Sequence, residues 1–314
     1  METQPSPRWA LVTGTSTGIG RATVLKLAAE GIFVFAGVRR PADGESLAAE
    51  FAQKAARTDE GNPQMVPLIL DVADSASVQA AIEQVRARSG TAGLWALVNN
   101  AGIAVGGPIE TVTLADWRRQ FDTNFFGWIE LIQGALPLLR QGVLLHGAKV
   151  PRIVLVSSIG GRVAQPFLAP YTCSKWATTA LGDSLRLELR RQGIGVTVIE
   201  PGAIATAIWG KGKTRLAEIG PEHPARQVYG PELEGLDQVV NTAAAGAIPA
   251  EVAGDAIVRA LIAEVAPAYV VIGRDAKIAS FLKRILPASW FDALLLKQFH
   301  LTDASTPKST VSTT

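Results

Sequence analysis

Residues 154–189 read VLVSSIGGRVAQPFLAPYTCSKWATTALGDSLRLEL, and this stretch says more about the fold and the chemistry than any other part of the chain. The apolar run at 153–156 is typical of a buried strand, and the serines and glycines at 157–161 indicate where that strand ends. Tyr171 and Lys175 stand four residues apart at the start of a helix-like segment. Because residues four apart share one face of a helix, the phenol and the ammonium can point into the same pocket.

The Tyr171–Lys175 pair suits proton transfer. A tyrosine titrates at about pH 10 in water, so it is a poor base at neutral pH. A nearby cation lowers the pKa of the phenol, and a general acid or base works best when its pKa lies near the operating pH. Ser158, at the expected strand end, can donate a hydrogen bond to a substrate oxygen. Together the three side chains predict chemistry at a carbonyl or alcohol oxygen. A tyrosine and a lysine on the surface of a helix would have the same spacing, so other motifs have to decide.

The N-terminal part of the chain contains the next motif. Residues 9–12 predict a short buried strand that runs into TGTSTGIG at 13–20 and then into a helical segment ending at Gly31. A strand, a glycine-rich turn and a helix in this order present backbone N–H groups to a phosphate. The spacing G-x-x-x-G-x-G differs from the usual dinucleotide fingerprint, and an ordinary tight turn is the alternative.

A second strand is expected at 32–38, and it ends at Arg39-Arg40. In a nucleotide-binding βαβ unit, an acidic residue near this strand end binds the ribose hydroxyls, whereas an arginine can pair with a 2′-phosphate. Since no carboxylate stands here, the sequence favours NADP, with NAD as the alternative cofactor. Arg39 could also be a solvated loop residue.

Strands and helices continue to alternate along the chain, which predicts a parallel sheet with helices on both faces. Ligands bind such sheets at the carboxyl ends of the strands, where every motif named so far falls. The further segments are helices at 46–56, 75–88 and 114–139, strands at 66–70, 94–98 and 195–200, a loop at 140–151 and a last strand at 269–272.

Composition bounds the class of protein. The chain has 314 residues, 48% of them hydrophobic and 18% charged, as expected for a folded globular protein. The net charge of +2 argues against nucleic acid as a partner. The single cysteine, Cys173, fits a reducing compartment, and the three histidines form no cluster that would suggest a metal site. No apolar run reaches the ~18 residues of a membrane span, and the N-terminus has no secretory signal, so we expect a cytoplasmic protein.

The motifs together resemble those of the short-chain dehydrogenase/reductase family. Their order and spacing match the family over about residues 8–206. The resemblance implies a Rossmann-type, doubly wound and mainly parallel sheet of seven strands. It rests on TGTSTGIG at 13–20, Asp71-Val72, NNAG at 99–102, Asn124, Ser158, Tyr171-x-x-x-Lys175 and PG-x-x-x-T at 201–206.

The resemblance also implies roles in catalysis. Tyr171 would be the acid/base, and Lys175 would lower its pKa and hold the nicotinamide ribose. Ser158 would polarise the substrate oxygen, and Asn124 would hold a water that continues the proton path from Lys175. Hydride would pass between the nicotinamide and the carbinol carbon of the substrate, while the proton would pass through Tyr171.

Further positions are implied to bind the cofactor. The glycine turn would lie under the pyrophosphate, Asp71 and Val72 would contact adenine, and the segment at 201–206 would seat the nicotinamide. Thr17 stands where some NADP-preferring members carry a basic residue, so the NADP prediction rests on Arg39 with help from Arg40. The expected cofactor-binding residues are Gly14, Ser16, Thr17, Gly18, Ile19, Gly20, Arg39, Arg40, Asp71, Val72, Asn99, Ala101, Gly102, Tyr171, Lys175, Pro201, Gly202, Ile204 and Thr206.

The C-terminal part is expected to recognise the substrate. We expect one catalytic domain at 8–273, flanked by disordered residues at 1–7 and 302–314. Within it, residues 203–250 form an apolar lid that covers a lipophilic alcohol or ketone. Ile208, Trp209, Leu216 and Ile219 would belong to the lid, and Val105, Ile109, Phe167 and Leu168 to the opposite wall.

Residues 274–301 predict a helical extension with a basic, amphipathic pattern in two helices joined at Pro287. These helices could rest on a membrane surface, pack on a partner subunit or fold over the substrate mouth. The whole pattern resembles the hydroxysteroid and retinol dehydrogenase branch, and a homo-oligomer is expected. A dinucleotide sensor without turnover is the competing hypothesis. Such proteins usually lose the tyrosine or the lysine, and this chain keeps both, which favours an enzyme.

Overall fold

The computed structural model describes residues 7–55, 65–146, 150–206, 224–299 and 301. The predicted disordered ends, residues 1–7 and 302–314, lie outside the described residues except for Pro7. The same is true of the lid residues Ile208, Trp209, Leu216 and Ile219.

One sheet organises the described part of the chain. It has seven parallel strands in the order β3-β2-β1-β4-β5-β6-β7. Its central strands are almost entirely apolar and buried, as expected when both faces are covered. The strands are β1 Trp9–Val12, β2 Phe33–Val38, β3 Met65–Ile69, β4 Ala96–Asn99, β5 Arg152–Val156, β6 Gly195–Pro201 and β7 Tyr269–Ile272.

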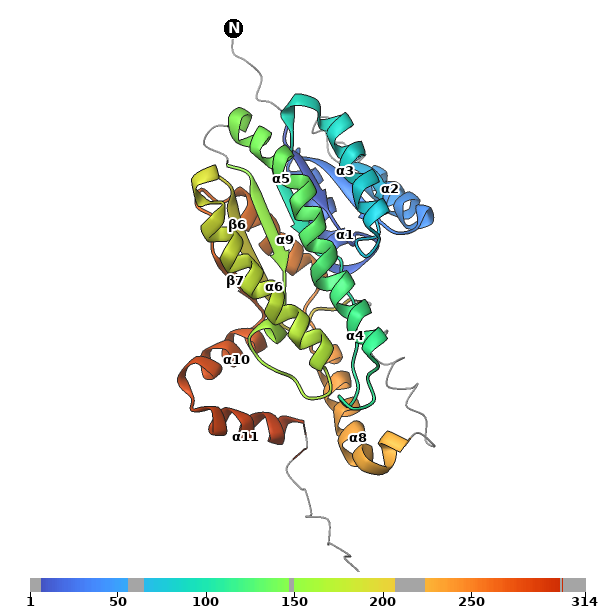
Figure 1. Ribbon diagram of the computed structural model, residues 1–314, viewed down its shortest axis with the longest axis vertical. Coiled ribbons are helices and arrows are strands. Elements are labelled where there is room, and N and C mark those ends of the chain that lie inside the picture. The colour runs from blue at the N-terminus through green and yellow to red at the C-terminus, as the bar shows by residue number, and fades with distance from the viewer. Residues whose placement is uncertain (1–6, 56–64, 147–149, 207–223, 300, 302–314) are drawn as a thin grey trace, which may run out of the picture.

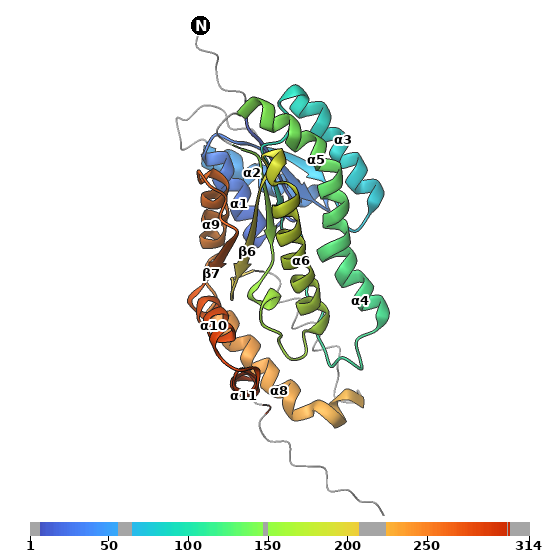
Figure 2. The same ribbon diagram turned by 60° about the vertical axis from the view of Figure 1, so that its left-hand side comes forward.

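Helices cover both faces of the sheet (Figure 1; Figure 2). One hydrophobic core lies between the sheet and α1, α2 and α9, and a second lies between the sheet and α3, α5 and α6. The prediction of a Rossmann-type fold is therefore confirmed. The helices are α1 Gly18–Ala29, α2 Pro41–Ala55, α3 Ser75–Ser89, α4 Leu114–Phe121, α5 Gly127–His146, α6 Ala169–Glu188, α8 Pro224–Ala245, α9 Ala250–Ile262, α10 Arg274–Ile285 and α11 Ala288–Gln298.

The region at 114–151 differs from the sequence-based expectation in two ways. The expected single helix is interrupted by one π-helical turn, Asp122–Phe126. The loop predicted at 140–151 is wrong, because α5 continues to His146. Gly142 suggested a break, but it allows close packing instead: a Cβ there would lie 2.2 Å from the Leu94 carbonyl oxygen.

Three helices gather at the carboxyl end of the sheet, the lower end in Figure 1: α8, α10 and α11. The two C-terminal helices pack Ala276 and Phe291 against Ile159 and Val163, which follow β5. They therefore cover the end of the sheet where the sequence places the reactive residues. None of the described helices combines the length and the apolar character that crossing a membrane requires.

Candidate active site

A cavity of about 420 Å³ opens at the carboxyl ends of the strands. The turn after β1 lines one end of it, and the segments after β2, β3, β4, β5 and β6 line its sides. Tyr171 and Lys175 reach it from α6. Motifs that lie far apart in the sequence thus meet in one cavity, as the fold predicts for a parallel sheet.

The glycine turn at Gly14 and Gly18 brings backbone close to backbone. Gly14 has a φ of 67°, and a Cβ there would lie 2.7 Å from the Cα of Ala101. The turn leads into α1, whose N-cap residue Thr17 makes no side-chain capping bond. The N–H groups of the first helical turn thus keep their capacity to bind an anion, and no acidic residue lies in that turn.

The two arginines after β2 have different surroundings. Arg39 lines the cavity. Arg40 is exposed and pairs with Asp43 at 2.8 Å, and it does not line the cavity. The expectation that both arginines reach the cofactor is therefore corrected to Arg39 alone.

Ser158 and Tyr171 lie together at the end of β5. Ser158 caps a 3-10 turn, Ile159–Gly161, and its Oγ accepts a hydrogen bond from the Gly160 N–H at 3.1 Å. The Ser158 side chain also hydrogen-bonds to Tyr171, which sits in the first turn of α6. A Cβ at Gly160 would lie 3.3 Å from the Tyr171 ring, so a small residue is needed between the two.

Lys175 is buried one helical turn after Tyr171. Its Nζ donates to the Val156 carbonyl oxygen at 2.8 Å and lies 5.1 Å from the centre of the Trp128 ring. Burial lowers the pKa of Lys175 to about 7. The amine can therefore gain and lose a proton near neutral pH.

The pKa of Tyr171 departs from the sequence-based expectation. Burial raises the pKa of this phenol, and the hydrogen bond with Ser158 opposes that rise. The expected lowering of the Tyr171 pKa by the Lys175 charge is therefore not the dominant effect. The Lys175 Nζ lies 5.7 Å from the centre of the Tyr171 ring. Desolvation, which disfavours the charged form of both groups, outweighs their attraction.

Asn124 lies in the π-helical turn and is fully buried. Its side-chain amide binds both backbone groups of Ile103 at 2.9 and 3.0 Å, and it donates to Ser174 Oγ at 3.2 Å. Gln120, one turn earlier, also donates to Ile103 and Ser174. The Asn124 amide thus holds the segment after β4 against α6, and a water-binding role for this residue stays a prediction.

Most of the predicted cofactor residues line the cavity, together with Ser158, and four predicted site residues do not: Gly20, Arg40, Asn99 and Asn124. Gly20 lies beneath the turn, where a Cβ would meet the Gly14 carbonyl oxygen at 2.4 Å. Asn99 is fully buried, and neither amide atom has a hydrogen-bond partner among the described residues. Those that do line it are Gly14, Ser16, Thr17, Gly18, Ile19, Arg39, Asp71, Val72, Ala101, Gly102, Tyr171, Lys175, Pro201, Gly202, Ile204 and Thr206.

Asn100 takes the place that the sequence analysis gave to Asn99. It lines the cavity, and its amide donates to the carbonyl oxygens of Thr13 and Gly14 at 2.8 and 3.1 Å. Alternation along the strand could have found it, because the neighbours in Asn99-Asn100 must point in opposite directions.

The wall opposite the glycine turn is mostly apolar. Phe167 and Leu168 line it as predicted, whereas Val105 is buried and Ile109 is exposed, and neither reaches the cavity. Sequence reasoning missed residues from α8 and α11, because their place depends on how these helices fold back. They are Leu236, Val239, Val240, Ala243, Gln298 and Phe299.

Comparisons with known proteins agree with this geometry. A family model for short chain dehydrogenases matches residues 8–216. An NADPH-dependent 3-dehydrocapnine reductase from Ornithobacterium rhinotracheale is 33% identical over 92% of this chain and 96% of its own. The 17-beta-hydroxysteroid dehydrogenase type 6 of Bos taurus is 35% identical over 71% of this chain and 66% of its own. A short-chain dehydrogenase structure from Streptomyces avermitilis has a TM-score of 0.72 and 28% identity, covering 96% of this chain and all of that one.

The chain therefore belongs to the short-chain dehydrogenase/reductase family of NAD(P)-dependent oxidoreductases. Its residues fit a bound dinucleotide. Gly14 and Gly18 of the glycine turn line the cavity without side chains, for which the neighbouring Ala101 and Thr206 leave no space, and the uncapped start of α1 suits a pyrophosphate. The described residues contain no cluster of ligands that could hold a metal ion.

Proposed function

We propose that the protein is an NADP(H)-preferring dehydrogenase/reductase. Its substrate would be a lipophilic secondary alcohol or ketone, or a retinoid-like alcohol or aldehyde. One observation carries the proposal. Ser158, Tyr171 and Lys175 line the same cavity as the glycine turn at the start of α1. Acid/base groups and a phosphate-binding turn are thereby joined in a single site.

The preference for NADP rests on Arg39. Arg39 lines the cavity at the end of β2, where its guanidinium can pair with a 2′-phosphate. Asp71 and Val72, after β3, would hold the adenine, and the segment from Pro201 would hold the nicotinamide. The relative from O. rhinotracheale is named as NADPH-dependent, which supports the same choice.

Tyr171 would supply the proton. In the reductive direction, the hydride for the carbonyl carbon would come from a nicotinamide held by the segment from Pro201. The Tyr171 hydroxyl gives its proton to the carbonyl oxygen, and Ser158 donates a hydrogen bond to the same oxygen. In its protonated form Lys175 would stabilise the tyrosinate that remains, and its pKa of about 7 means that it can also release and regain this proton at neutral pH. The oxidative direction reverses these transfers.

The shape and chemistry of the cavity support a lipophilic substrate. Apolar side chains from three separate elements face it: Phe167 and Leu168 before α6, Val239 and Val240 in α8, and Phe299 after α11. Gln165 and Gln298 add polar groups that can bind a distant oxygen of the substrate. Burying apolar substrate surface against such walls contributes about 25 cal/mol per Å².

The C-terminal helices also support a contact with a membrane surface. Phe281 is 61% and Trp290 67% exposed, and Lys283 and Arg284 lie in the last turn of the same helix as Phe281. Exposed aromatic and basic side chains on such helices suit anionic lipids. Co-sedimentation with anionic vesicles should therefore fall for the double variant Phe281→Asp/Trp290→Asp. Equal sedimentation of the variant and the wild type would contradict this contact.

We further propose a homo-oligomer in the cytoplasm. Leu114, Phe126 and Trp176, on neighbouring helices, are 71%, 56% and 47% exposed and could meet a second copy. The single cysteine in the sequence agrees with a reducing compartment. Light scattering coupled to size-exclusion chromatography tests the oligomer, and a monomer at micromolar concentration would contradict it.

A substrate panel tests the proposed function. Absorbance at 340 nm is followed with NADPH and with NADH, using ketones, steroids and retinaldehyde, and with NADP and the matching alcohols. We expect turnover with lipophilic members and a lower KM for NADPH than for NADH. If both cofactors bind but no substrate changes the absorbance, the protein is a dinucleotide sensor instead.

A further inference from the structure

An ion pair between a fully buried carboxylate and a partly exposed arginine lies next to the segments that carry the reactive residues. Glu200 is fully buried in β6, and both of its carboxylate oxygens accept hydrogen bonds from Arg162 Nε, at 2.6 and 2.7 Å. The Arg162 side chain is 34% exposed. Burial raises the pKa of Glu200, and the Arg162 guanidinium opposes that rise. A carboxylate so deep in the protein needs its partner, because an unpaired buried charge is strongly unfavourable.

The pair joins two segments that frame the cavity. Arg162 follows the 3-10 turn that Ser158 caps, and Glu200 directly precedes Pro201 and Gly202, where the nicotinamide is proposed to sit. The pair is therefore a side-chain link between the segment proposed to polarise the substrate oxygen and the segment proposed to hold the cofactor ring, in addition to the backbone hydrogen bond from Ser157 to Ile199. Neither Arg162 nor Glu200 lines the cavity itself.

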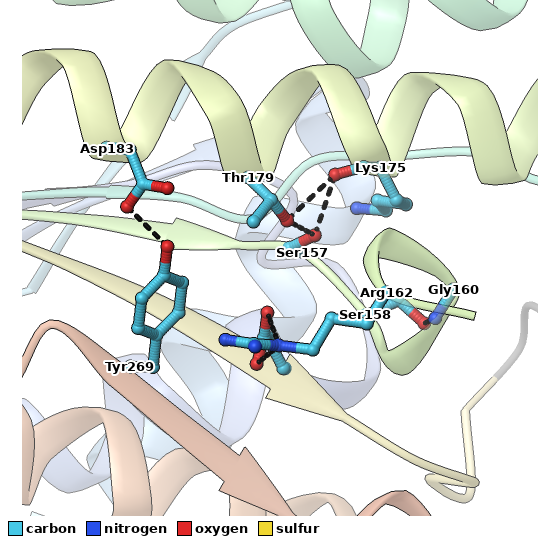
Figure 3. Close-up of polar contacts among 9 residues, drawn as sticks. Ser157, Ser158, Gly160, Arg162, Lys175, Thr179, Asp183 and Tyr269 are labelled. Atoms are coloured by element: carbon cyan, nitrogen blue, oxygen red, sulfur yellow. Dashed lines mark hydrogen bonds and ion pairs between the residues drawn. The ribbon is translucent and has the colours of Figure 1, made fainter. Parts of the chain in front are cut away.

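Further contacts fix the guanidinium in place (Figure 3). It lies 4.4 Å from the centre of the Tyr269 ring, in β7. The Tyr269 hydroxyl donates a hydrogen bond to Asp183, on α6, and Asp183 pairs with Arg186 at 2.7 Å. The network thus connects β6, β7 and the turn after β5 to the helix that carries Tyr171 and Lys175.

The turn itself is packed tightly against α6. A Cβ at Gly161 would lie 2.6 Å from Thr179 Oγ1 and 2.7 Å from Ser157 Oγ. Ser157 Oγ in turn donates to the Lys175 carbonyl oxygen at 3.1 Å. A shift of Arg162 would therefore be transmitted to Ser158 and to the backbone at Lys175.

We propose that Arg162 and Glu200 are positioning residues for the reaction. The ion pair sets the distance between the Ser158 turn and the Pro201–Gly202 segment, so that the substrate oxygen held by Ser158 and Tyr171 lies at the correct distance from the nicotinamide. This inference rests on the proposed function. It assigns no contact with the substrate or the cofactor to either residue.

Three variants separate positioning from stability. Glu200→Gln keeps the shape and an acceptor for Arg162 but removes the charge. Arg162→Met removes the guanidinium. The double variant Arg162→Met/Glu200→Leu replaces the ion pair with apolar side chains, a change that often leaves stability intact. Arg86→Met, at an exposed ion pair with Glu83 on α3, is the matched control.

For each variant, kcat and KM are measured with NADPH and the best substrate of the panel, and Tm and the NADPH dissociation constant are measured alongside. We expect kcat of the double variant to fall about tenfold or more while Tm stays near that of the wild type, because small displacements at a reacting centre have effects of this size. Glu200→Gln should lose less of its kcat than the double variant. In both, KM should change less than kcat. Arg86→Met should have the kcat and KM of the wild type.

Two results would overturn the inference. One is wild-type kcat in the double variant or in Glu200→Gln. The other is a loss of kcat that follows the loss of Tm across all the variants, which would mean that the pair only stabilises the fold. If Arg162→Met does not fold, Glu200→Gln and the double variant still test the positioning role. A wild-type protein without turnover would instead refute the proposed function, so the two failures are distinguishable.

Discussion

Replacing Lys175 with methionine should change how the stability of the protein depends on pH. Lys175 is buried, and burial lowers its pKa from 10.5 to about 7. In the unfolded chain the same amine keeps its proton up to about pH 10. Between these two pH values the unfolded state binds more protons than the folded state, so the free energy of unfolding rises with pH.

The size of the effect follows from the pKa. A difference of roughly 3.5 pKa units, at about 1.4 kcal/mol per unit, corresponds to about 5 kcal/mol of destabilisation by the buried ammonium. This cost is fully present below pH 7 and disappears as the pH approaches 10. Methionine fills a similar volume and has no proton to lose. Relative to the Lys175→Met variant, the wild type should therefore gain about 2 kcal/mol between pH 7 and pH 9.

Urea unfolding of both proteins at pH 6, 7, 8 and 9 measures this difference. Subtracting the two free energies at each pH cancels the titration of all other groups, and the lost hydrogen bond to the Val156 carbonyl adds a nearly constant offset. A difference that stays constant within about 0.5 kcal/mol from pH 7 to pH 9 would show that the Lys175 amine titrates normally, and it would refute the reasoning.

The remaining predictions concern the cofactor and the substrate wall. Gly14→Ala should weaken NADPH binding at least about tenfold in fluorescence titrations, because a Cβ there meets the Ala101 backbone. The control Gly31→Ala, with a similar φ of 69° and open space around it, should bind NADPH normally and lose only about 1 kcal/mol of stability. Equal NADPH binding by the two variants would contradict the role of the turn. Arg39→Ala should raise KM for NADPH more than KM for NADH. Arg40 pairs with Asp43 and does not line the cavity, so Arg40→Ala should change neither KM. Identical effects of the two variants would argue against Arg39 as the phosphate ligand. Phe299→Ala should raise KM several-fold for bulky lipophilic substrates and leave KM for small ketones unchanged, because the substitution opens the cavity wall after α11. The same change in KM for every substrate of the panel would exclude a role of Phe299 in selectivity.

The sequence predicts much of this fold because its motifs fall at strand ends. Each apolar run that stops at a polar or glycine-rich segment is a strand of the sheet, and parallel strands bring those segments to one edge. The predicted residues at 269–272 coincide with β7, and the two C-terminal helices lie within a few residues of the expected bounds. Periodicity and turn residues are local features, so they can be read without the tertiary structure.

The wrong predictions share one cause: each concerned a feature that depends on tertiary packing. Gly142 signals a break in the sequence, but in the fold it lets α5 pass the Leu94 backbone. Lys175 suggests a cation that lowers the pKa of Tyr171, but burial dominates both groups. Phe299 gives no sign of its place in the cavity wall, because that place depends on how α10 and α11 fold back over the sheet.

Stopped-flow oxidation of NADPH by the Tyr171→Phe variant tests the central claim, that a phenol beside the glycine turn supplies the proton. Tyr229, whose hydroxyl bonds to Glu110 and which does not line the cavity, provides the control, Tyr229→Phe, which keeps the aromatic ring beside Phe167. With a substrate from the panel, Tyr171→Phe should transfer hydride about 10²- to 10⁴-fold more slowly than the wild type and bind NADPH within about threefold of it, while Tyr229→Phe reacts normally. Hydride transfer by Tyr171→Phe at a rate near that of the wild type would contradict the account.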